Sequence, residues 1–361
     1  MSEGKLKTAV LGLNDQGRLL LEAASKIDYF QIKAVADRDS NIAERIAEEY
    51  KCQPYDDYRQ LITAMDSYSQ SEPGTSANGD NCCLMVAAGM YSCDKQVRTA
   101  MKKKFNILKL APAARNFEEA AEFVRLAEEE DIKFAVANAS RFAQSFLAFR
   151  RFLQQGRIEQ IFLITAICNV AGPEQPTWQS DPKLAGGGVL LRNCYGIIDQ
   201  IIWNFPTPQH IYSLSSNQAA DKQQRLYLTE DTALVTMKFN DTLIGNLIAS
   251  KAFGPEQKFL KVYGKDKILT VSNNQFTVSD GLGQKIEEWK YDDDETGWYT
   301  ALLENFALSI LSPEENKLCS SGRENLKNMA VIESAYLSAR TAMPEEPDRI
   351  LQMAQIEPTS I

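Results

Sequence analysis

The chain has 361 residues, 44% of them hydrophobic and 24% charged, so two domains with ample cores are expected. The net charge of −9, from 39 basic and 48 acidic residues, argues against nucleic acid and against an anionic membrane surface as partners. No apolar run approaches the roughly 20 residues that span a bilayer, and no secretory signal is expected at the start. Seven cysteines without a Cys-x-x-Cys pair, and one histidine, predict a reducing cytoplasmic location and no histidine-based metal site.

Short apolar runs alternate with amphipathic stretches over the first third of the chain. Strands are expected at residues 6–12, 30–36, 81–88, 106–110 and 133–137, and helices at 16–25, 41–50, 95–103 and 117–130. Strict alternation predicts parallel pairing with right-handed crossovers, hence an α/β doubly wound sheet of Rossmann type. Only Asp66–Asp80, rich in Ser, Gly, Asn and Pro, breaks the rhythm, and a mobile surface loop is expected there.

After residue 140 the pattern changes to a helix at 145–155, the stretch 158–170 and then consecutive strands. Strands with hairpin-like spacing are expected at residues 210–216, 233–240, 243–252, 259–263, 268–272, 275–279 and 286–290. Two final helices are expected at residues 298–311 and 323–341. The sequence thus predicts a Rossmann-type domain over 1–138 and an α+β domain over 139–361 with a large, mostly antiparallel sheet. It leaves open whether the final helices pack back on the first domain.

The turn after the first expected strand reads Gly12-Leu-Asn14-Asp-Gln-Gly17, close to a dinucleotide-binding fingerprint. The first and third glycines are present, but Asn14 takes the second place, and its side chain is expected to project where a diphosphate would lie. Asp37, at the end of the second strand, is placed to accept from a ribose hydroxyl and favours NAD, whereas Arg38 beside it leaves NADP open. The alternatives are a domain that binds NAD(H) or NADP(H) and one that no longer binds nucleotide.

A second motif runs from Trp178 to Asp199 and includes Asp181, three glycines at 186–188 and the run Arg192-Asn-Cys-Tyr-Gly. Three glycines opening an apolar helix would let a ligand approach the backbone at the domain junction. The order of these residues resembles the glucose–fructose oxidoreductase/inositol dehydrogenase (Gfo/Idh/MocA) family, which commonly reads Trp-x-x-Asp, then Gly-Gly-Gly-Ala-Leu-Leu-Asp-x-Gly-x-His-x-x-Asp. The resemblance covers essentially the whole chain through residues 34–39, Pro112, Arg141-Phe142 and Ser338-Ala-Arg340.

The resemblance implies a nicotinamide-dependent oxidoreductase whose cofactor also passes Ala88 and Pro112. In that family the lysine of Glu-Lys-Pro and the histidine of the glycine motif serve acid–base catalysis, because hydride transfer to or from an alcohol requires a matched proton transfer. Here the lysine position is Ala111 and the histidine position is Gly196, neither of which exchanges a proton. The usual mechanism therefore cannot run. Lys109, two residues before Ala111, would be misplaced by roughly 6–7 Å unless its amine reaches back.

Several side chains remain as candidates for chemistry. Arg192 could bind a carboxylate or phosphate through its planar guanidinium, with a salt bridge to Asp199 or another neighbour as the alternative. Tyr195 could donate a proton, with plain packing as the alternative. The substrate-binding candidates implied by the motif are Arg141, Trp178, Asp181, Gly187 and Asp199. For Arg141, a strut between domains is the alternative.

Three functions stay open. The first is an atypical reductase without the lysine–histidine pair, with chemistry like that of biliverdin reductase, which also resembles this family; there Arg192 would hold propionates or help deliver a proton. The second is a pseudoenzyme that acts as a ligand-binding or protein-interaction module. The third is an ordinary sugar or polyol dehydrogenase with substitute acid–base groups. The resemblance also implies a homodimer or larger homo-oligomer through the open face of the second sheet.

Overall fold

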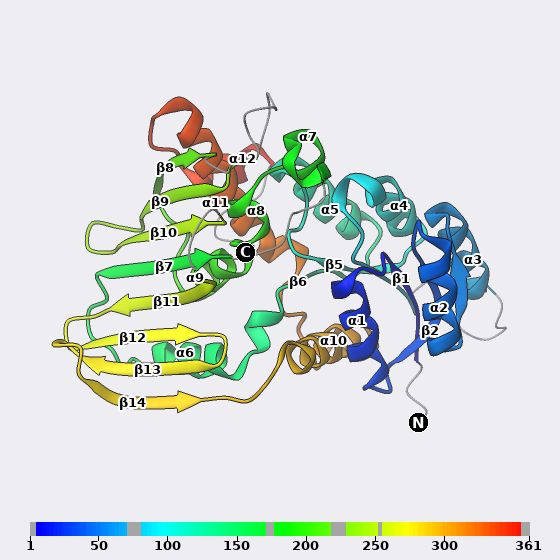
Figure 1. Cartoon of the computed structure of the whole chain (residues 1–361), viewed down its shortest axis with the longest axis horizontal. Helices are drawn as coiled ribbons and strands as arrows, with labels where there is room; N and C mark the ends of the chain where they lie inside the picture. The colour runs from blue at the N-terminus through cyan, green and yellow to red at the C-terminus, as the bar shows by residue number, and fades with distance from the viewer. Residues whose placement is uncertain (1–4, 71–80, 171–176, 218–228, 252–254, 355–361) are drawn as a thin grey trace. The chain divides into compact units, whose positions relative to one another are not determined.

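The computed structural model describes residues 5–70, 81–170, 177–217, 229–251 and 255–354, and the chain divides into two compact units (Figure 1). The first unit comprises residues 1–113, 121–139 and 295–322. The second comprises residues 114–120, 140–294 and 323–361. Among the described residues, no helix is long and apolar enough to cross a membrane.

The first unit is built on a six-stranded parallel sheet in the order β3-β2-β1-β4-β5-β6, which confirms the doubly wound prediction. The strands are β1 (Leu6–Leu11), β2 (Phe30–Ala36), β3 (Gln53–Tyr55), β4 (Cys82–Val86), β5 (Asn106–Leu110) and β6 (Phe134–Ala137). The helices are α1 (Asp15–Ser25), α2 (Ser40–Tyr50), α3 (Tyr58–Gln70), α4 (Met90–Lys102), α5 (Phe117–Glu129, whose first turn is assigned to the second unit) and α10 (Glu295–Leu311). Along β4 and β5 every residue is buried, as expected for strands covered on both faces.

One expectation for the first unit is wrong. Residues 66–70 do not begin a loop but complete α3, which, with β3, was not expected. The helix is carried by the buried side chains Leu61, Ile62 and Met65, which lie on one face, so packing outweighs the poor helix propensity of the serines that follow. The rest of the expected loop lies outside the described residues.

The second unit contains an eight-stranded sheet in the order β14-β13-β12-β11-β7-β10-β9-β8, in which only the β7–β10 pair is parallel. The strands are β7 (Leu163–Asn169), β8 (His210–Ser216), β9 (Thr232–Lys238), β10 (Ile244–Ser250), β11 (Gln257–Tyr263), β12 (Lys267–Ser272), β13 (Gln275–Asp280) and β14 (Lys285–Lys290). The predicted mostly antiparallel sheet is thereby confirmed.

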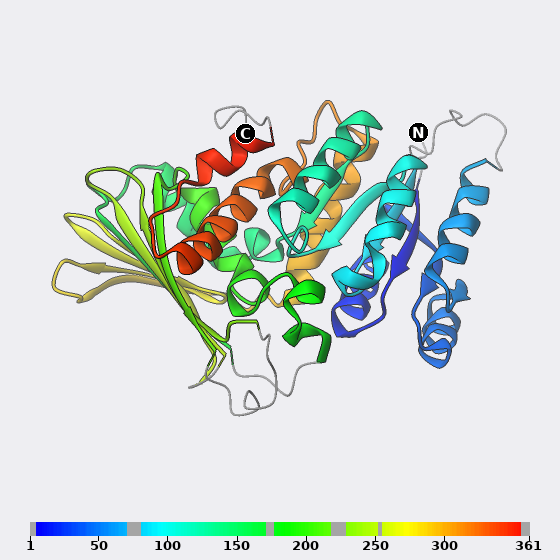
Figure 2. The same ribbon diagram turned by 90° about the horizontal axis from the view of Figure 1, so that it is seen from above.

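Helices cover one face of this sheet, as Figure 2 shows for the second unit. They are α6 (Gln144–Gln154), α9 (Tyr195–Asn204) and α11 (Gly322–Thr341), followed by the short α12 (Pro347–Met353), which was not expected. Burial alternates along the strands, so the opposite face carries exposed side chains such as Leu214 and Leu234, with 54% and 47% of their surface exposed.

Candidate functional site

The turn between β1 and α1 requires both of its glycines. Gly12 has a φ of +92°, and a Cβ there would lie 2.4 Å from the backbone nitrogen of Ala88. A Cβ on Gly17 would lie 2.1 Å from the carbonyl oxygen of Gly12. The two glycines therefore let the β1–α1 turn pack against the β4–α4 turn and let α1 pack tightly on its own turn, as in a dinucleotide-binding fingerprint.

Asn14 does not project from this turn as the sequence suggested. Its side-chain oxygen accepts from the backbone N–H of Gly17 at 2.9 Å, and its amide donates to the carbonyl oxygen of Ala87 at 2.9 Å. Asn14 is thus the N-cap of α1, and its side chain folds back onto its own unit. The turn fits a diphosphate better than the sequence alone indicated.

Asp37 and Arg38 follow the end of β2. The Asp37 carboxylate accepts from the backbone N–H of Leu13 at 2.8 Å and from that of Asp39 at 3.1 Å. The Arg38 guanidinium lies 5.9 Å from the centre of the Tyr58 ring and 5.7 Å from that of the Tyr91 ring. Arg38 has no ion pair with an acidic side chain in the described part of the chain, so its charge faces outward between two aromatic rings.

The end of β5 carries no group in the position of the family lysine. Ala111, which precedes Pro112 through a cis peptide bond, cannot exchange a proton. Lys109 is 2% exposed, and its amine donates to the carbonyl oxygen of Pro112 at 3.3 Å. The amine thus reaches forward along the strand but stays inside the unit. Burial raises the pKa of the neighbouring Cys93 thiol to about 11, although Lys109 acts in the opposite direction.

In the second unit, α7 (Pro182–Ala185) precedes the glycines, and two helices, α8 (Val189–Arg192) and α9, follow them where one was expected. Asp181 caps α7, accepting from the backbone N–H of Lys183 at 2.8 Å. The breaks fall at the glycines 186–188 and at Asn193-Cys194. The single continuous helix that the sequence suggested is therefore wrong.

The three glycines are explained by packing inside the second unit. A Cβ on Gly187 would lie 2.1 Å from the hydroxyl oxygen of Tyr336, and one on Gly188 would lie 1.9 Å from the carbonyl oxygen of Glu230. Gly186 has a φ of +78°. The close approach that the sequence assigned to a ligand is made by the protein's own chain at these positions. Gly187 as a substrate contact stays a prediction.

Glu230 and Tyr336 hold this segment in place. The Glu230 carboxylate accepts from the backbone N–H groups of Gly188 at 2.7 Å and Leu190 at 2.9 Å, and from the Tyr336 hydroxyl at 2.9 Å. The Tyr336 hydroxyl in turn accepts from the N–H of Leu191 at 3.2 Å. Burial raises the pKa of Glu230 above its ordinary value, whereas these hydrogen bonds lower it.

Sequence reasoning did not find Glu230 or Tyr336. Both lie far along the chain from the glycines they contact, and neither belongs to a recognisable motif. Because carboxylates and tyrosines are common on strands and helices, only the tertiary contact distinguishes this pair. The one available signal was the glycine triplet itself, which implies that something bulky lies close by.

Arg192 is held against an aromatic ring but meets no anion. Its guanidinium lies 4.6 Å from the centre of the Trp178 ring. Within the described ranges it makes no hydrogen bond or ion pair. Burial lowers the pKa of Arg192 to about 10, because no neighbouring carboxylate offsets the loss of water around the charge. The predicted alternative of a salt bridge with Asp199 is wrong.

Asp199 pairs with Arg141 instead. The Arg141 guanidinium donates to the two carboxylate oxygens of Asp199 at 2.8 and 2.7 Å, with the side chains 4% and 0% exposed. Asn328 donates to the same carboxylate at 2.7 Å, and Glu324 lies 3.3 Å from the guanidinium. This fork-to-fork pair is complete within the second unit. A substrate role for either residue stays a prediction.

Tyr195 and Gly196 open α9. Tyr195 is buried, and its hydroxyl donates to the side-chain oxygen of Asn325 at 2.9 Å. At Gly196 a Cβ would meet only the Ser140 hydroxyl oxygen, 3.8 Å away, so space is available where the family carries histidine. Proton donation by Tyr195 stays a prediction.

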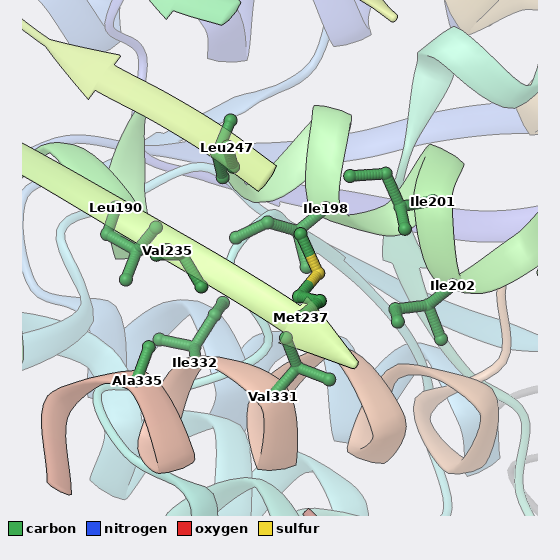
Figure 3. A pocket seen from close by; sticks show the side chains of 10 residues that line it. All are labelled: Leu190, Ile198, Ile201, Ile202, Val235, Met237, Leu247, Val331, Ile332 and Ala335. Carbon is green, nitrogen blue, oxygen red and sulfur yellow. The ribbon is translucent and has the colours of Figure 1, made fainter. Parts of the chain in front are cut away.

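A small cavity lies between the helix-covered face of the second sheet and the helices α8, α9 and α11 (Figure 3). It holds about 10 Å³ and is lined by apolar side chains, among them Leu190, Ile198, Met237 and Ile332. A cavity of this size without polar partners neither orders water nor binds a substrate, so it belongs to the core. The described residues contain no cluster of three or more histidine, cysteine or acidic side chains that could hold a metal ion.

Comparison with known proteins agrees with this architecture. A family model for the oxidoreductase family Gfo/Idh/MocA, C-terminal alpha/beta domain, matches residues 150–346, more than half of the chain. An uncharacterized protein of Saccharomyces cerevisiae, YMR315W, is 23% identical over 265 residues, covering 67% of this chain and 72% of its own.

Solved structures share the fold at low sequence identity. Levoglucosan dehydrogenase in complex with NADH and levoglucosan superposes with a TM-score of 0.82 at 14% identity, over 95% of this chain and 99% of that one. The WlbA dehydrogenase from Bordetella pertussis, in complex with NADH and UDP-GlcNAcA, gives 0.77 at 14% identity over 95% and 99%. Aldose-aldose oxidoreductase from Caulobacter crescentus gives 0.79 at 15% identity over 95% and 100%. By its two-sheet architecture and its matched C-terminal domain, the chain belongs to the Gfo/Idh/MocA oxidoreductase family.

Proposed function

We propose that this protein is a nicotinamide-dependent oxidoreductase that acts on an anionic compound without the lysine–histidine pair of its family. The observation that carries the proposal is Arg192, a half-buried guanidinium stacked on Trp178 with no anion supplied by the described chain. Taking a charge out of water without a partner is unfavourable, so a carboxylate or phosphate on the ligand would complete the site.

The first unit would hold the dinucleotide. The glycine turn and the folded-back Asn14 leave the N-terminal end of α1 compatible with a diphosphate. The levoglucosan dehydrogenase and WlbA structures, which share this fold, were solved with NADH and support the same class of cofactor here. When bound, the nicotinamide would supply or accept the hydride.

Arg38 would favour the 2′-phosphate of NADPH. The Asp37 carboxylate already accepts two backbone N–H groups, whereas Arg38 presents a charge that no acidic side chain of the described residues neutralises. An arginine at the end of the second strand is the usual partner of that phosphate. Arg38→Met is therefore expected to weaken NADPH about tenfold or more and to leave NADH binding nearly unchanged, as measured by calorimetry.

Proton transfer cannot follow the family route, because Ala111 and Gly196 carry no titratable group. In the proposed reductase, Arg192 binds the anionic substituent and stabilises negative charge that develops as the hydride is added, and the proton that completes the reduction would come from water. The proposal assigns no proton transfer to Tyr195, whose hydroxyl is held by Asn325 inside the unit.

The test is reduction of a panel of carboxylated carbonyl compounds and biliverdin by the full chain with NADPH, followed spectroscopically. Arg192→Met should reduce kcat/KM roughly 100-fold, because a desolvated charged partner of the substrate is lost. Arg157→Met, which removes a half-exposed surface ion pair with Glu287, is the matched control and should change little. Equal activity of Arg192→Met and the native chain would contradict the proposal.

Two other results of this assay would favour the two alternative functions, a pseudoenzyme or an ordinary dehydrogenase. Cofactor or anion binding without turnover on any member of the panel would favour a ligand-binding protein descended from an enzyme. NADH or NADPH formation from common polyols at alkaline pH would favour an ordinary dehydrogenase with substitute acid–base groups.

The open face of the second sheet would bind a second copy of the chain. Cross-strand neighbours form one apolar row over five strands, in the order Leu214, Leu234, Ile248, Ile167 and Phe259. Leu214 and Leu234 are exposed and the other three are partly exposed, and such a continuous apolar row is typical of an interface. Leu234→Glu should shift the mass measured by analytical ultracentrifugation from dimer to monomer. A monomeric native chain would contradict this part of the proposal.

A further inference from the structure

Two cysteines, Cys168 and Cys194, lie at the two ends of the stretch that carries the glycine triplet and Arg192. The thiol of Cys168, at the end of β7, lies 3.4 Å from the carbonyl oxygen of Asn193, and the thiol of Cys194 lies 3.8 Å from the carbonyl oxygen of Cys168. Both side chains are buried and neither is in a disulfide.

The environment makes the two thiols unequal. Lys258 is the cross-strand partner of Cys168 in the antiparallel β7–β11 pair, which brings a cation beside this sulfur. The neighbouring Cys194 thiol, followed by the charge of Lys258, lowers the pKa of the Cys168 thiol against the effect of burial. Burial and the neighbouring Cys168 thiol raise the pKa of the Cys194 thiol well above its ordinary value. This difference, together with the cation beside Cys168, favours Cys168 as the attacking thiol and Cys194 as the second one.

We propose that Cys168 and Cys194 form a reversible disulfide that closes the chain between them into a covalent loop. The cysteines are 26 positions apart, and the intervening chain carries Trp178, the glycines and Arg192. The bond would tie the segment that ends at Arg192 to β7, so the local stability of residues 186–192 would depend on the redox state. This inference does not rest on the proposed oxidoreductase function.

The oxidant is a hydroperoxide. The Cys168 thiolate attacks one peroxide oxygen, the O–O bond breaks, and the product is a sulfenic acid plus hydroxide, which takes the proton that Cys168 released and leaves as water. The Cys194 sulfur then attacks the sulfenic sulfur, the S–S bond forms, the S–O bond breaks and a second water leaves with the Cys194 proton. Two thiols are oxidised by two electrons, and one peroxide is reduced to two waters.

The test treats the reduced full chain with limiting hydrogen peroxide, blocks the remaining thiols with an alkylating reagent and maps the peptides by mass spectrometry. We expect a linked peptide pair containing Cys168 and Cys194 as the main product, lighter by two hydrogens and restored by dithiothreitol. Cys52 is the matched competitor, because it is more exposed but burial still raises the pKa of its thiol to about 11.

Two further measurements keep the proposal falsifiable. Lys258→Met should slow formation of the linked pair several-fold, because the cation beside Cys168 is lost. In the oxidised protein, amide hydrogen exchange over residues 186–192 should slow, and the Cys194→Ala variant should show no such change on peroxide treatment.

Oxidation of Cys52 or Cys319 with Cys168 and Cys194 still reduced would overturn the proposal. So would over-oxidation of Cys168 without a linked pair. The mapping uses the native chain, so a poorly folding cysteine variant would not affect that result.

Discussion

Arg141 and Arg192, both in the second unit, each lie on a tryptophan ring, yet their surroundings differ. The Arg141 guanidinium lies 5.1 Å from the Trp203 ring centre and is paired with Asp199 through both of its oxygens. The Arg192 guanidinium lies 4.6 Å from the Trp178 ring centre and has no carboxylate partner among the described residues. Both guanidinium groups therefore contact a tryptophan ring, and only that of Arg141 is also paired with a carboxylate of the described residues.

This difference distinguishes a charged side chain that stabilises the fold from one that is expected to bind a ligand. A buried ion pair with all its hydrogen bonds made is part of the fold, and removing one partner leaves the other charge uncompensated. A half-buried cation without an anion lowers stability by itself and is retained where a ligand supplies the missing charge. We therefore propose that Arg141 is structural and that Arg192 binds a ligand.

The sharpest way to break the comparison is to replace each arginine by methionine. Arg141→Met should lower the free energy of unfolding by about 3–5 kcal/mol, because Asp199 remains buried without its partner. Arg192→Met should leave the free energy of unfolding unchanged or raise it, since an unpaired charge is removed. Chemical denaturation of both variants checks the pair, and equal losses would remove the distinction between the two arginines.

A second pair of variants asks whether the glycine segment is shaped by the protein or by a ligand. Gly188→Ala places a Cβ 1.9 Å from the carbonyl oxygen of Glu230 and should cost about 1–3 kcal/mol of stability. Gly196→Ala meets only the Ser140 hydroxyl at 3.8 Å and, inside a helix, should be neutral or stabilising by up to about 1 kcal/mol. Thermal unfolding of the two variants gives the comparison, and a harmless Gly188→Ala would show that the segment is not locked by Glu230.

The lock itself is tested by Tyr336→Phe, which should cost about 1–3 kcal/mol because Glu230 and the N–H of Leu191 each lose a buried partner. Burial raises the folded-state pKa of Glu230, so this residue favours folding below its unfolded pKa of about 4.3, and the contribution is lost as pH rises through the folded pKa. The Tyr336 hydroxyl lowers the pKa of Glu230, and its removal raises that pKa further. The deficit of Tyr336→Phe should therefore be larger at pH 7 than at pH 4, and a deficit independent of pH would contradict the link to Glu230.

The smallest effect is expected in the first unit. Asn14→Ala removes the N-cap of α1 and should cost about 1 kcal/mol, whereas Asn14→Asp should retain most of the cap. If Asn14 instead projected toward the diphosphate, Asn14→Ala would tighten NADPH binding. Unfolding measurements and NADPH titrations on the same variants distinguish the capping role of Asn14 from a side chain that projects toward the diphosphate.

The sequence predicts the sheets well because their patterns are local. Alternation of apolar strands with helices indicates the parallel sheet, and period-two burial indicates the open face of the second one. The site is less predictable, because its partners are chosen in three dimensions: Asp199 pairs with Arg141, 58 positions away, and not with Arg192 on the preceding helix. The glycine triplet correctly predicts that other atoms pack closely against the backbone there. The residues that do so, Glu230 and Tyr336, lie 40 or more positions further along the chain.

We propose that Arg192 binds an anionic group of the ligand. Calorimetric titration of the full chain with succinate and with inorganic phosphate tests this in the native protein, Arg192→Met and the surface control Arg157→Met. We expect at least one anion to bind the native chain and Arg157→Met, with at least a tenfold loss of affinity in Arg192→Met. Equal affinities in all three proteins, or no binding of either anion to the native chain, would contradict it.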